Sequence, residues 1–302
     1  MKPDNRFINL GKDFWANVRT ISEECGYTTR TKKNDPASGE IKVPLIEEIR
    51  QALTNRGLDY SHITNDNNEL TSFGELLVAY YHFRADVLNK TVENQLMDVD
   101  KARNNFENLR STLNPNCPIP LNKQKGEKKA PAYFTGMINM LIEANSAGHS
   151  CDYDPRKLTT VTKDRKPLRT LARRVDGAFP SIVNPVAVWE IKEYYYTTTF
   201  GSRVADAVYE TLLDGMELEE LQEHEGIEVK HYLMVDSHYT WWNCGKSYLC
   251  RIIDMLHMGY VDEVLFGYEI IGRLSYIVKE WVELVKRRNT FGTDSVSESA
   301  LQ

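Results

Sequence analysis

The feature that most constrains this chain is a stretch with the pattern of a β-hairpin, residues 173–196. Two runs rich in valine and aromatic residues flank proline and asparagine turn signals. Asp176 and Glu190 lie seven residues on either side of Val183, so a hairpin folded there places them opposite each other. Opposed residues of antiparallel strands share a face, with Cα atoms about 4.5–5.5 Å apart. Lys192, two residues beyond Glu190, lies on that face too, so we expect all three charged side chains on one patch of sheet.

Two carboxylates placed so close together need a counter-charge. At about 5 Å and an effective dielectric near 20, they repel each other by about 3 kcal/mol, and like charges are normally avoided across strands. A divalent cation removes this repulsion. Mg²⁺ binds one or two carboxylates, keeps several waters and accepts phosphate oxygens. The acid pair and its lysine therefore predict a magnesium site that acts on a phosphate group.

The same residues resemble a known signature. Asp176, separated by 13 residues from Glu190-Ile191-Lys192 on an apolar strand, is similar to the PD-(D/E)xK motif of metal-dependent nucleases, a family that includes many type II restriction endonucleases. Val175 stands where the family has proline. The resemblance covers roughly residues 130–270. An Asp at a turn beside a surface Glu-x-Lys pair on an edge strand is the alternative interpretation.

The resemblance implies a role for each residue. Asp176, Glu190 and the Ile191 carbonyl would bind Mg²⁺, and Lys192 would position or help deprotonate the attacking water. The helix before the sheet often supplies a further acid in this family, and Glu143 is the candidate for that metal ligand. A solvent-facing Glu143 near a helix end is the alternative.

The resemblance also implies an activity, the Mg²⁺-dependent hydrolysis of DNA phosphodiester bonds by an endonuclease. The chain length favours a type II restriction endonuclease, acting as a homodimer on a specific sequence of double-stranded DNA. One alternative is another nuclease of the same core, used in repair, recombination or phage defence. The other is a non-catalytic DNA-binding scaffold.

Basic residues concentrate just before the acid pair, although the whole chain has a net charge of −6. Between residues 156 and 174 there are eight basic residues and one acid. A basic strip leading into an acidic metal site suits a phosphodiester backbone, because Lys and Arg neutralise phosphates; a pair of solvated loops is the alternative. The candidate DNA contacts are Arg165, Lys166, Arg169, Arg173 and Arg174 in the strip, and Arg203 in the first turn of the following helix.

The order of the predicted elements indicates three parts. Residues 1–125 read as a helical region with a possible role in DNA binding or dimerisation. In residues 126–288 helices and strands alternate, which predicts an α/β fold with a mixed central sheet flanked by helices, a restriction-endonuclease-like core. Residues 289–302 are polar and serine-rich, and we expect a disordered tail there.

Several classes of protein are excluded or disfavoured. No apolar run approaches the roughly 20 residues that a membrane span needs, and residues 1–15 lack the apolar centre of a signal peptide. Five cysteines without a CxxC pair favour a cytoplasmic protein without structural zinc. Gly245-Lys246-Ser247 resembles part of a phosphate-binding loop, but Thr240 stands where that loop needs glycine, so we expect no nucleotide cofactor.

Overall fold

Helices form the N-terminal region. The computed structural model describes the chain except residues 30–38, 125–127, 198–200 and 299–302, and except the side chains of residues 203 and 289–298. The first helices are α1 (Lys12–Cys25), α2 (Ile46–Asn55) and α3 (Ser72–Val87), and α3 continues into η2 (Leu88–Val92) and α4 (Glu93–Gln95). Apolar side chains at helical spacing form the core between them, among them Phe14, Val18, Ile21, Ile49, Leu53, Leu77 and Tyr80.

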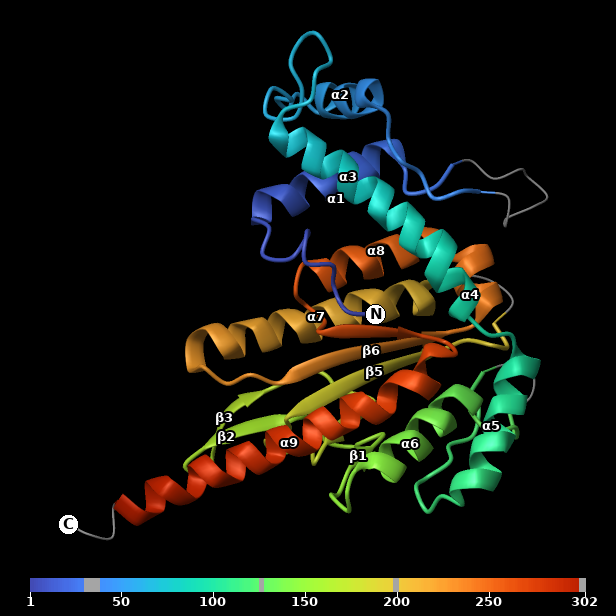
Figure 1. The fold of residues 1–302 in the computed structure, drawn as a ribbon, viewed down its shortest axis with the longest axis vertical. Helices are drawn as coiled ribbons and strands as arrows, with labels where there is room; N and C mark the ends of the chain where they lie inside the picture. The colour runs from blue at the N-terminus through green and yellow to red at the C-terminus, as the bar shows by residue number, and fades with distance from the viewer. Residues whose placement is uncertain (30–38, 125–127, 198–200, 299–302) are drawn as a thin grey trace.

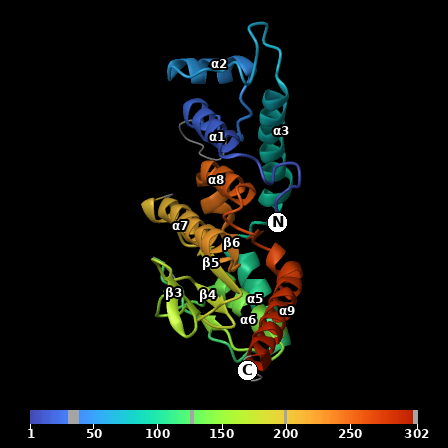
Figure 2. The same cartoon turned by 90° about the vertical axis from the view of Figure 1, so that its left-hand side faces the viewer.

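The N-terminal helices stack beyond α8 (Lys246–His257), at one end of the molecule (Figures 1 and 2). A buried ion pair joins them to α8, with Nη1 of Arg84 2.9 Å from Oδ1 of Asp254. The hydroxyl of Tyr80 donates a second hydrogen bond to the same carboxylate, at 2.6 Å. Because both partners of the ion pair are buried, breaking it leaves an uncompensated charge, and the contact fixes α3 on α8.

A mixed five-stranded sheet forms the centre of the rest of the chain (Figure 1). Its strands, in spatial order, are β1 (Asp152–Tyr153), β4 (Gly177–Phe179), β5 (Ala187–Glu193), β6 (Lys230–Asp236) and β7 (Glu263–Phe266). Strand β4 is antiparallel to both of its neighbours, β1 and β5, whereas β5, β6 and β7 are parallel to one another. The expected α/β class with a mixed sheet is therefore confirmed.

Helices cover both faces of this sheet. One face carries α6 (Tyr133–Asn145) and α9 (Glu269–Glu298), and the other carries α7 (Ser202–Glu225) and α8 (Figure 1). Successive residues of β5 point to opposite faces: Trp189 stacks on Trp281 of α9, whereas Val188 packs with Leu218 and Leu221 of α7. The even-numbered residues of β5 therefore face α7.

Helix α5 (Val99–Leu113) packs on α6 rather than on the N-terminal helices. Its N-cap residue Asp98 accepts a hydrogen bond from Lys101 N–H at 2.8 Å, which starts the helix. Phe106 of α5 lies so close to Gly136 that a Cβ atom there would be 2.6 Å from the phenyl ring. A larger residue at position 136 would force the two helices apart.

Three further segments complete the description of the fold. Part of the basic strip forms a hairpin of β2 (Thr160–Lys163) and β3 (Lys166–Thr170), because Asp164 and Arg165 adopt positive φ angles of 50° and 63° at its turn. Helix α9 runs to Glu298, into the segment for which we expect a disordered tail, and that expectation stays a prediction. Residues 238–244 form η3 (His238–Cys244), in which Trp241 and Trp242 are buried. Within the described parts of the chain, no helix combines the length and apolarity that crossing a bilayer requires.

Candidate active site

The hairpin of β4 and β5 has the predicted register. Gly177 pairs with Trp189 and Phe179 with Ala187, and Asp176 and Glu190 are the residues next to the last pair of this ladder. The backbone N–H of Asp176 donates to the Trp189 carbonyl, at 3.1 Å, so the strands shift by one residue at this end. Gly177 is required here, because a Cβ atom at that position would lie 2.1 Å from the Trp189 ring.

Asp176 ends the ladder with its side chain. Its Oδ2 accepts a hydrogen bond from the Ile191 N–H at 2.8 Å, in the place where a backbone carbonyl of β4 would otherwise bond. In a strand the N–H and C=O of one residue point to the same side. The Ile191 carbonyl therefore also points to the side on which Asp176 lies. Burial and the nearby charge of Glu190 raise the pKa of Asp176 to about 6.

Glu190 is fully buried, at 0% exposure, on the α7 face of β5. Its Oε2 lies 2.6 Å from Nζ of Lys192, and its Oε1 lies 3.0 Å from Nη1 of Arg173. Burial alone would raise the pKa of Glu190, but the charges of Lys192 and Arg173 outweigh it, so the pKa is lowered. For Lys192 burial acts against the charged form, and Glu190 and Asp176 outweigh it to raise the pKa. Glu190 and Lys192 therefore form an ion pair inside the protein.

Helix α7 brings two more carboxylates to this group. Arg173 contacts Glu210 at 3.2 Å and also forms an ion pair with Asp214. Glu210 and Asp214 are four residues apart, which places them on one face of the helix. Burial and the charge of Glu190 raise the pKa of Asp214 to about 7. The sequence reasoning did not find Asp214, although its spacing from Glu210 is a usable signal.

We refer to Asp176, Glu190, Glu210, Asp214, Arg173 and Lys192 as the acidic cluster. When all six groups are charged, four carboxylates face two cations, and the cluster has a net charge of −2. The raised pKa values of Asp176 and Asp214 indicate that protons offset part of this excess when the pH falls toward neutral. A bound cation is the other way in which such an excess can be offset.

The residues of the cluster fit Mg²⁺. Oε1 of Glu190 is buried and, although it forms an ion pair with Arg173, it accepts no hydrogen bond from the described residues. Oδ1 of Asp214 is also buried and accepts no hydrogen bond from them. Among the described residues no three His, Cys, Asp or Glu side chains are arranged as a ready metal site. Mg²⁺ does not require three, because it commonly binds one or two carboxylates and retains its waters. Arg173 would compete with Mg²⁺ for the Glu190 carboxylate, because it already forms an ion pair with it.

Glu143 does not join the cluster. It lies near the end of α6, and its Oε2 accepts a hydrogen bond from the backbone N–H of Asn116 at 2.9 Å. Thr135 and Asn139 are the α6 residues that line the cavity beside Asp176. The prediction that Glu143 is a metal ligand is therefore not retained, because its carboxylate accepts a hydrogen bond from the loop before α6.

The predicted DNA contacts separate into three groups. Arg165 and Lys166 are exposed at the tip of the β2–β3 hairpin, and Arg174 is exposed beside Asp176. Arg169 pairs with Glu220 of α7 at 2.9 Å. Arg173 is 23% exposed: its guanidinium contacts the acidic cluster, and the residue also lines the open cavity beside Asp176, so a DNA contact there stays a prediction. The side chain of Arg203 lies outside the described part of the chain.

Asp176 lies at the edge of an open cavity of about 960 Å³. Five basic side chains line this cavity: Lys123, Arg156, Lys157, Arg173 and Arg174. Its acidic residues are Asp154 and Asp176. The exposed end of the acid pair therefore opens onto a predominantly basic surface, as a polyanion requires.

Comparisons with known proteins identify two family models. A domain of unknown function (DUF7690) matches residues 1–91, and a domain of unknown function (DUF7687) matches residues 97–281. No curated protein and no solved structure matches the chain. The second model contains the sheet, the acid pair and Lys192, and the break between the two models falls at the end of α4. Because that model covers more than half of the chain, the protein belongs to the DUF7687 family.

Proposed function

We propose that this protein is a Mg²⁺-dependent endonuclease that hydrolyses DNA phosphodiester bonds. The observation that carries the proposal is that Asp176 and Glu190 both adjoin the last pair of an antiparallel ladder, where the Glu190 charge acts on Asp176 and Nζ of Lys192 lies 2.6 Å from Glu190. The mixed sheet, with one helix before and one after the acid-bearing strands, supports a restriction-endonuclease-like core of the PD-(D/E)xK type.

Asp176, Glu190 and the Ile191 carbonyl are the groups that would hold Mg²⁺. When bound, the ion neutralises negative charge on the phosphate and lowers the pKa of a water. Lys192 is 6% exposed and paired with Glu190, so its proposed role is to hold that carboxylate and to stabilise, from inside the protein, the charge that develops during attack. Asp176 is partly exposed at the basic cavity and is the acid that a substrate phosphate reaches first.

The basic surface supports DNA as the substrate. Arg156, Lys157 and Arg174 are exposed along the cavity that ends at Asp176. Each phosphate that they neutralise releases a counterion, so binding should weaken steeply with salt. A type II restriction endonuclease that dimerises on a specific duplex is the form of this proposal that the chain length favours. A repair, recombination or phage-defence nuclease of the same core is the neighbouring form.

One observation favours a different class of function. Arg173 and Lys192 already neutralise both oxygens of Glu190, as they would in a structural ion-pair network. A non-catalytic DNA-binding scaffold would need no more than this. The excess negative charge of the acidic cluster argues against the scaffold, because a structural network has no use for it.

The test is cleavage of plasmid and of linear phage DNA, with Mg²⁺ or with EDTA. We expect Mg²⁺-dependent cutting by the wild-type protein and a loss of at least about 100-fold in Asp176→Asn, since that change removes a metal ligand. Glu223→Gln, an exposed acid on α7, is the matched control and should cut at the wild-type rate. Wild-type cutting by Asp176→Asn, with an unchanged circular dichroism spectrum, refutes the proposed site. DNA binding without turnover selects the scaffold.

A further inference from the structure

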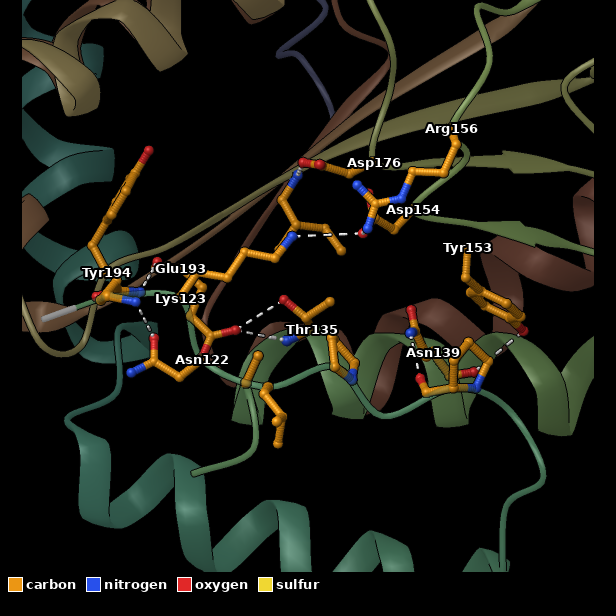
Figure 3. Close-up of a pocket in the computed structure, with 16 residues that line it drawn as sticks. Asn122, Lys123, Thr135, Asn139, Tyr153, Asp154, Arg156, Asp176, Glu193 and Tyr194 are labelled. Atoms are coloured by element: carbon orange, nitrogen blue, oxygen red, sulfur yellow. Dashed lines mark hydrogen bonds and ion pairs between the residues drawn. The ribbon is translucent and has the colours of Figure 1, made fainter. Parts of the chain in front are cut away.

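A second, smaller cavity lies on the α6 side of the sheet (Figure 3). Its volume is about 480 Å³, within the size range of small-ligand pockets. The start of α6, the segment before it and the end of β5 form its walls. Pro118, Pro120, Leu121, Ala132 and Ile191 give it apolar surface.

This small cavity meets the wide basic cavity at Asp176. Four residues line both: Lys123, Asp154, Arg156 and Asp176. At the junction Asp154 pairs with Arg156 at 3.2 Å and with Lys123 at 3.6 Å, as Figure 3 shows. A substrate whose phosphate lies at Asp176 can therefore extend into either cavity.

The two cavities differ in chemistry. The wide one has five basic residues and two acids, which suits a run of phosphates. The small one adds no basic residue to the two at the junction. Tyr153 and Tyr194 line it from opposite sides, and the Tyr194 ring turns away to pack on Trp241 with a centroid separation of 5.8 Å (Figure 3). The Tyr153 ring and the apolar walls suit the flat, uncharged face of a nucleobase.

The polar groups of the small cavity are held in place. Asn139 is buried, and its Nδ2 donates to the Pro118 carbonyl at 2.8 Å, so its Oδ1 remains an acceptor among the described residues. Oε2 of Glu193 accepts from the Thr135 N–H and Oγ1 at 3.0 and 2.9 Å, which fixes that carboxylate at the start of α6. Acceptors fixed in this way can receive the exocyclic amino groups of a base.

We infer that the small cavity takes an unpaired nucleobase next to the phosphate at Asp176, so that the preferred substrate is single-stranded DNA or a flipped-out nucleotide. A base in a duplex cannot reach this cavity, because the stack holds it away from the backbone side that contacts Asp176. The wide basic cavity then holds the phosphates on the other side of the reactive one. This inference rests on the proposed nuclease function and specifies its substrate class. It favours the repair, recombination or phage-defence form of that proposal over a restriction endonuclease that cuts intact duplex.

The test fills the small cavity and measures binding without turnover. The probe is a fluorescein-labelled single-stranded oligonucleotide, with the same sequence as a duplex, in EDTA. Ala132 lines the cavity at the start of α6, and Ala132→Leu and Ala132→Phe fill it in two steps. Ala16→Phe, on the exposed face of α1, is the matched control. Thermal unfolding checks that each variant is folded.

We expect Ala132→Phe to weaken single-strand binding about tenfold or more, the loss of about one stacked base, and Ala132→Leu to weaken it less. Duplex binding should change by less than about threefold, because it depends on the basic cavity. Equal losses for both probes, or wild-type binding of the single strand by folded Ala132→Phe, overturn the inference. Cleavage with Mg²⁺ is scored separately. Cavity-dependent binding without cleavage refutes the nuclease and keeps the base pocket, whereas cleavage with cavity-independent binding does the reverse.

Discussion

Replacing Arg173 with methionine tests whether the acidic cluster is held together as described. The guanidinium contacts Glu190, Glu210 and Asp214, and the Glu190 and Asp214 side chains are both 0% exposed. Methionine fills a similar volume and removes the charge. Breaking a buried ion pair by removing one partner typically costs about 3–5 kcal/mol, because the other charge stays buried and unpaired. We expect a loss of that size in the free energy of unfolding of Arg173→Met at pH 8.5.

The loss should depend on pH in a defined direction. Asp214 has a pKa of about 7 in the folded protein, above its ordinary value of 3.8, so the folded state holds this proton more tightly. Its stabilising contribution is complete below about pH 4 and disappears as the pH rises to about 7. Removing Arg173 raises this pKa further. At pH 5.5 Asp214 is then neutral in both proteins, and the difference in unfolding free energy should be at least about 1 kcal/mol smaller than at pH 8.5.

The other groups around Arg173 do not reverse this sign. Lys192 stays charged and keeps Glu190 ionised across the range. Burial lowers the pKa of His231, whose Nδ1 donates to the Tyr260 carbonyl, which disfavours a positive charge there. Asp176, with a pKa of about 6 that Arg173 lowers, titrates in the same range and changes the difference in the same direction. The pH dependence of the difference therefore reports on Asp214 and Asp176 together.

The measurement is urea unfolding at pH 5.5 and 8.5, followed by tryptophan fluorescence. Trp189 and Trp281 stack with a centroid separation of 5.2 Å beneath the acid pair and report on this part of the core. Arg174→Met is the control, since its side chain is exposed, and it should stay within about 0.5 kcal/mol of the wild type. A cost below about 1 kcal/mol at pH 8.5, or an equal cost at both pH values, would refute the description of Arg173 as the cation of this cluster.

Two further predictions concern the same end of β5. Arg173→Met should bind Mg²⁺ or Mn²⁺ more tightly than the wild type in calorimetry, because Glu190 loses a competing cation; weaker binding would show that Arg173 supports the metal site instead. Glu193→Gln should flatten the pH dependence of stability between about pH 4.5 and 7, because burial raises the pKa of Glu193 to about 7 and its proton stabilises the folded state below that value. Thermal midpoints measured across this range decide the second prediction, and an unchanged slope contradicts it.

The register of the hairpin could be predicted because it depends on local signals. The turn residues fix the centre of the hairpin, and a period of two then fixes which residues face each other. Asp176 and Glu190 are placed by these rules alone. Neither rule needs information from distant parts of the chain.

Arg173 could not be placed from the sequence. It lies in a run of basic residues that share the same composition, and nothing local distinguishes it from Arg174. Arg174 faces the solvent, whereas Arg173 turns toward α7 because it pairs there with a buried carboxylate. That carboxylate comes from a helix about 40 residues away in sequence, and only the packing of this helix on the sheet brings the two residues together.

The rotation of α6 about its own axis could not be predicted from the sequence either. The sequence of α6 is apolar with a single acid, and its residues are buried on nearly all sides. The pattern therefore does not predict which face of the helix packs on the sheet. The docking of α5 on α6, permitted by Gly136, sets this rotation and turns Thr135 and Asn139 toward the cavity. Glu143, one turn beyond Asn139, meets the loop at Asn116 instead.

The acidic cluster differs from an ordinary salt-bridge network in the way its parts are supplied. The six residues 171–176 contain both Asp176 and Arg173, so one short segment supplies a proposed metal ligand and the arginine that pairs with Glu190. Arg173 contacts three carboxylates, whereas Asp176 accepts a hydrogen bond from the Ile191 N–H and lines the open cavity. Lys192 and Arg173 favour the charged form of Asp176, but burial and the charge of Glu190 outweigh them and raise its pKa to about 6. A cation beside Asp176 would reverse that balance, which is why we propose that Mg²⁺ and a substrate phosphate meet at the basic cavity.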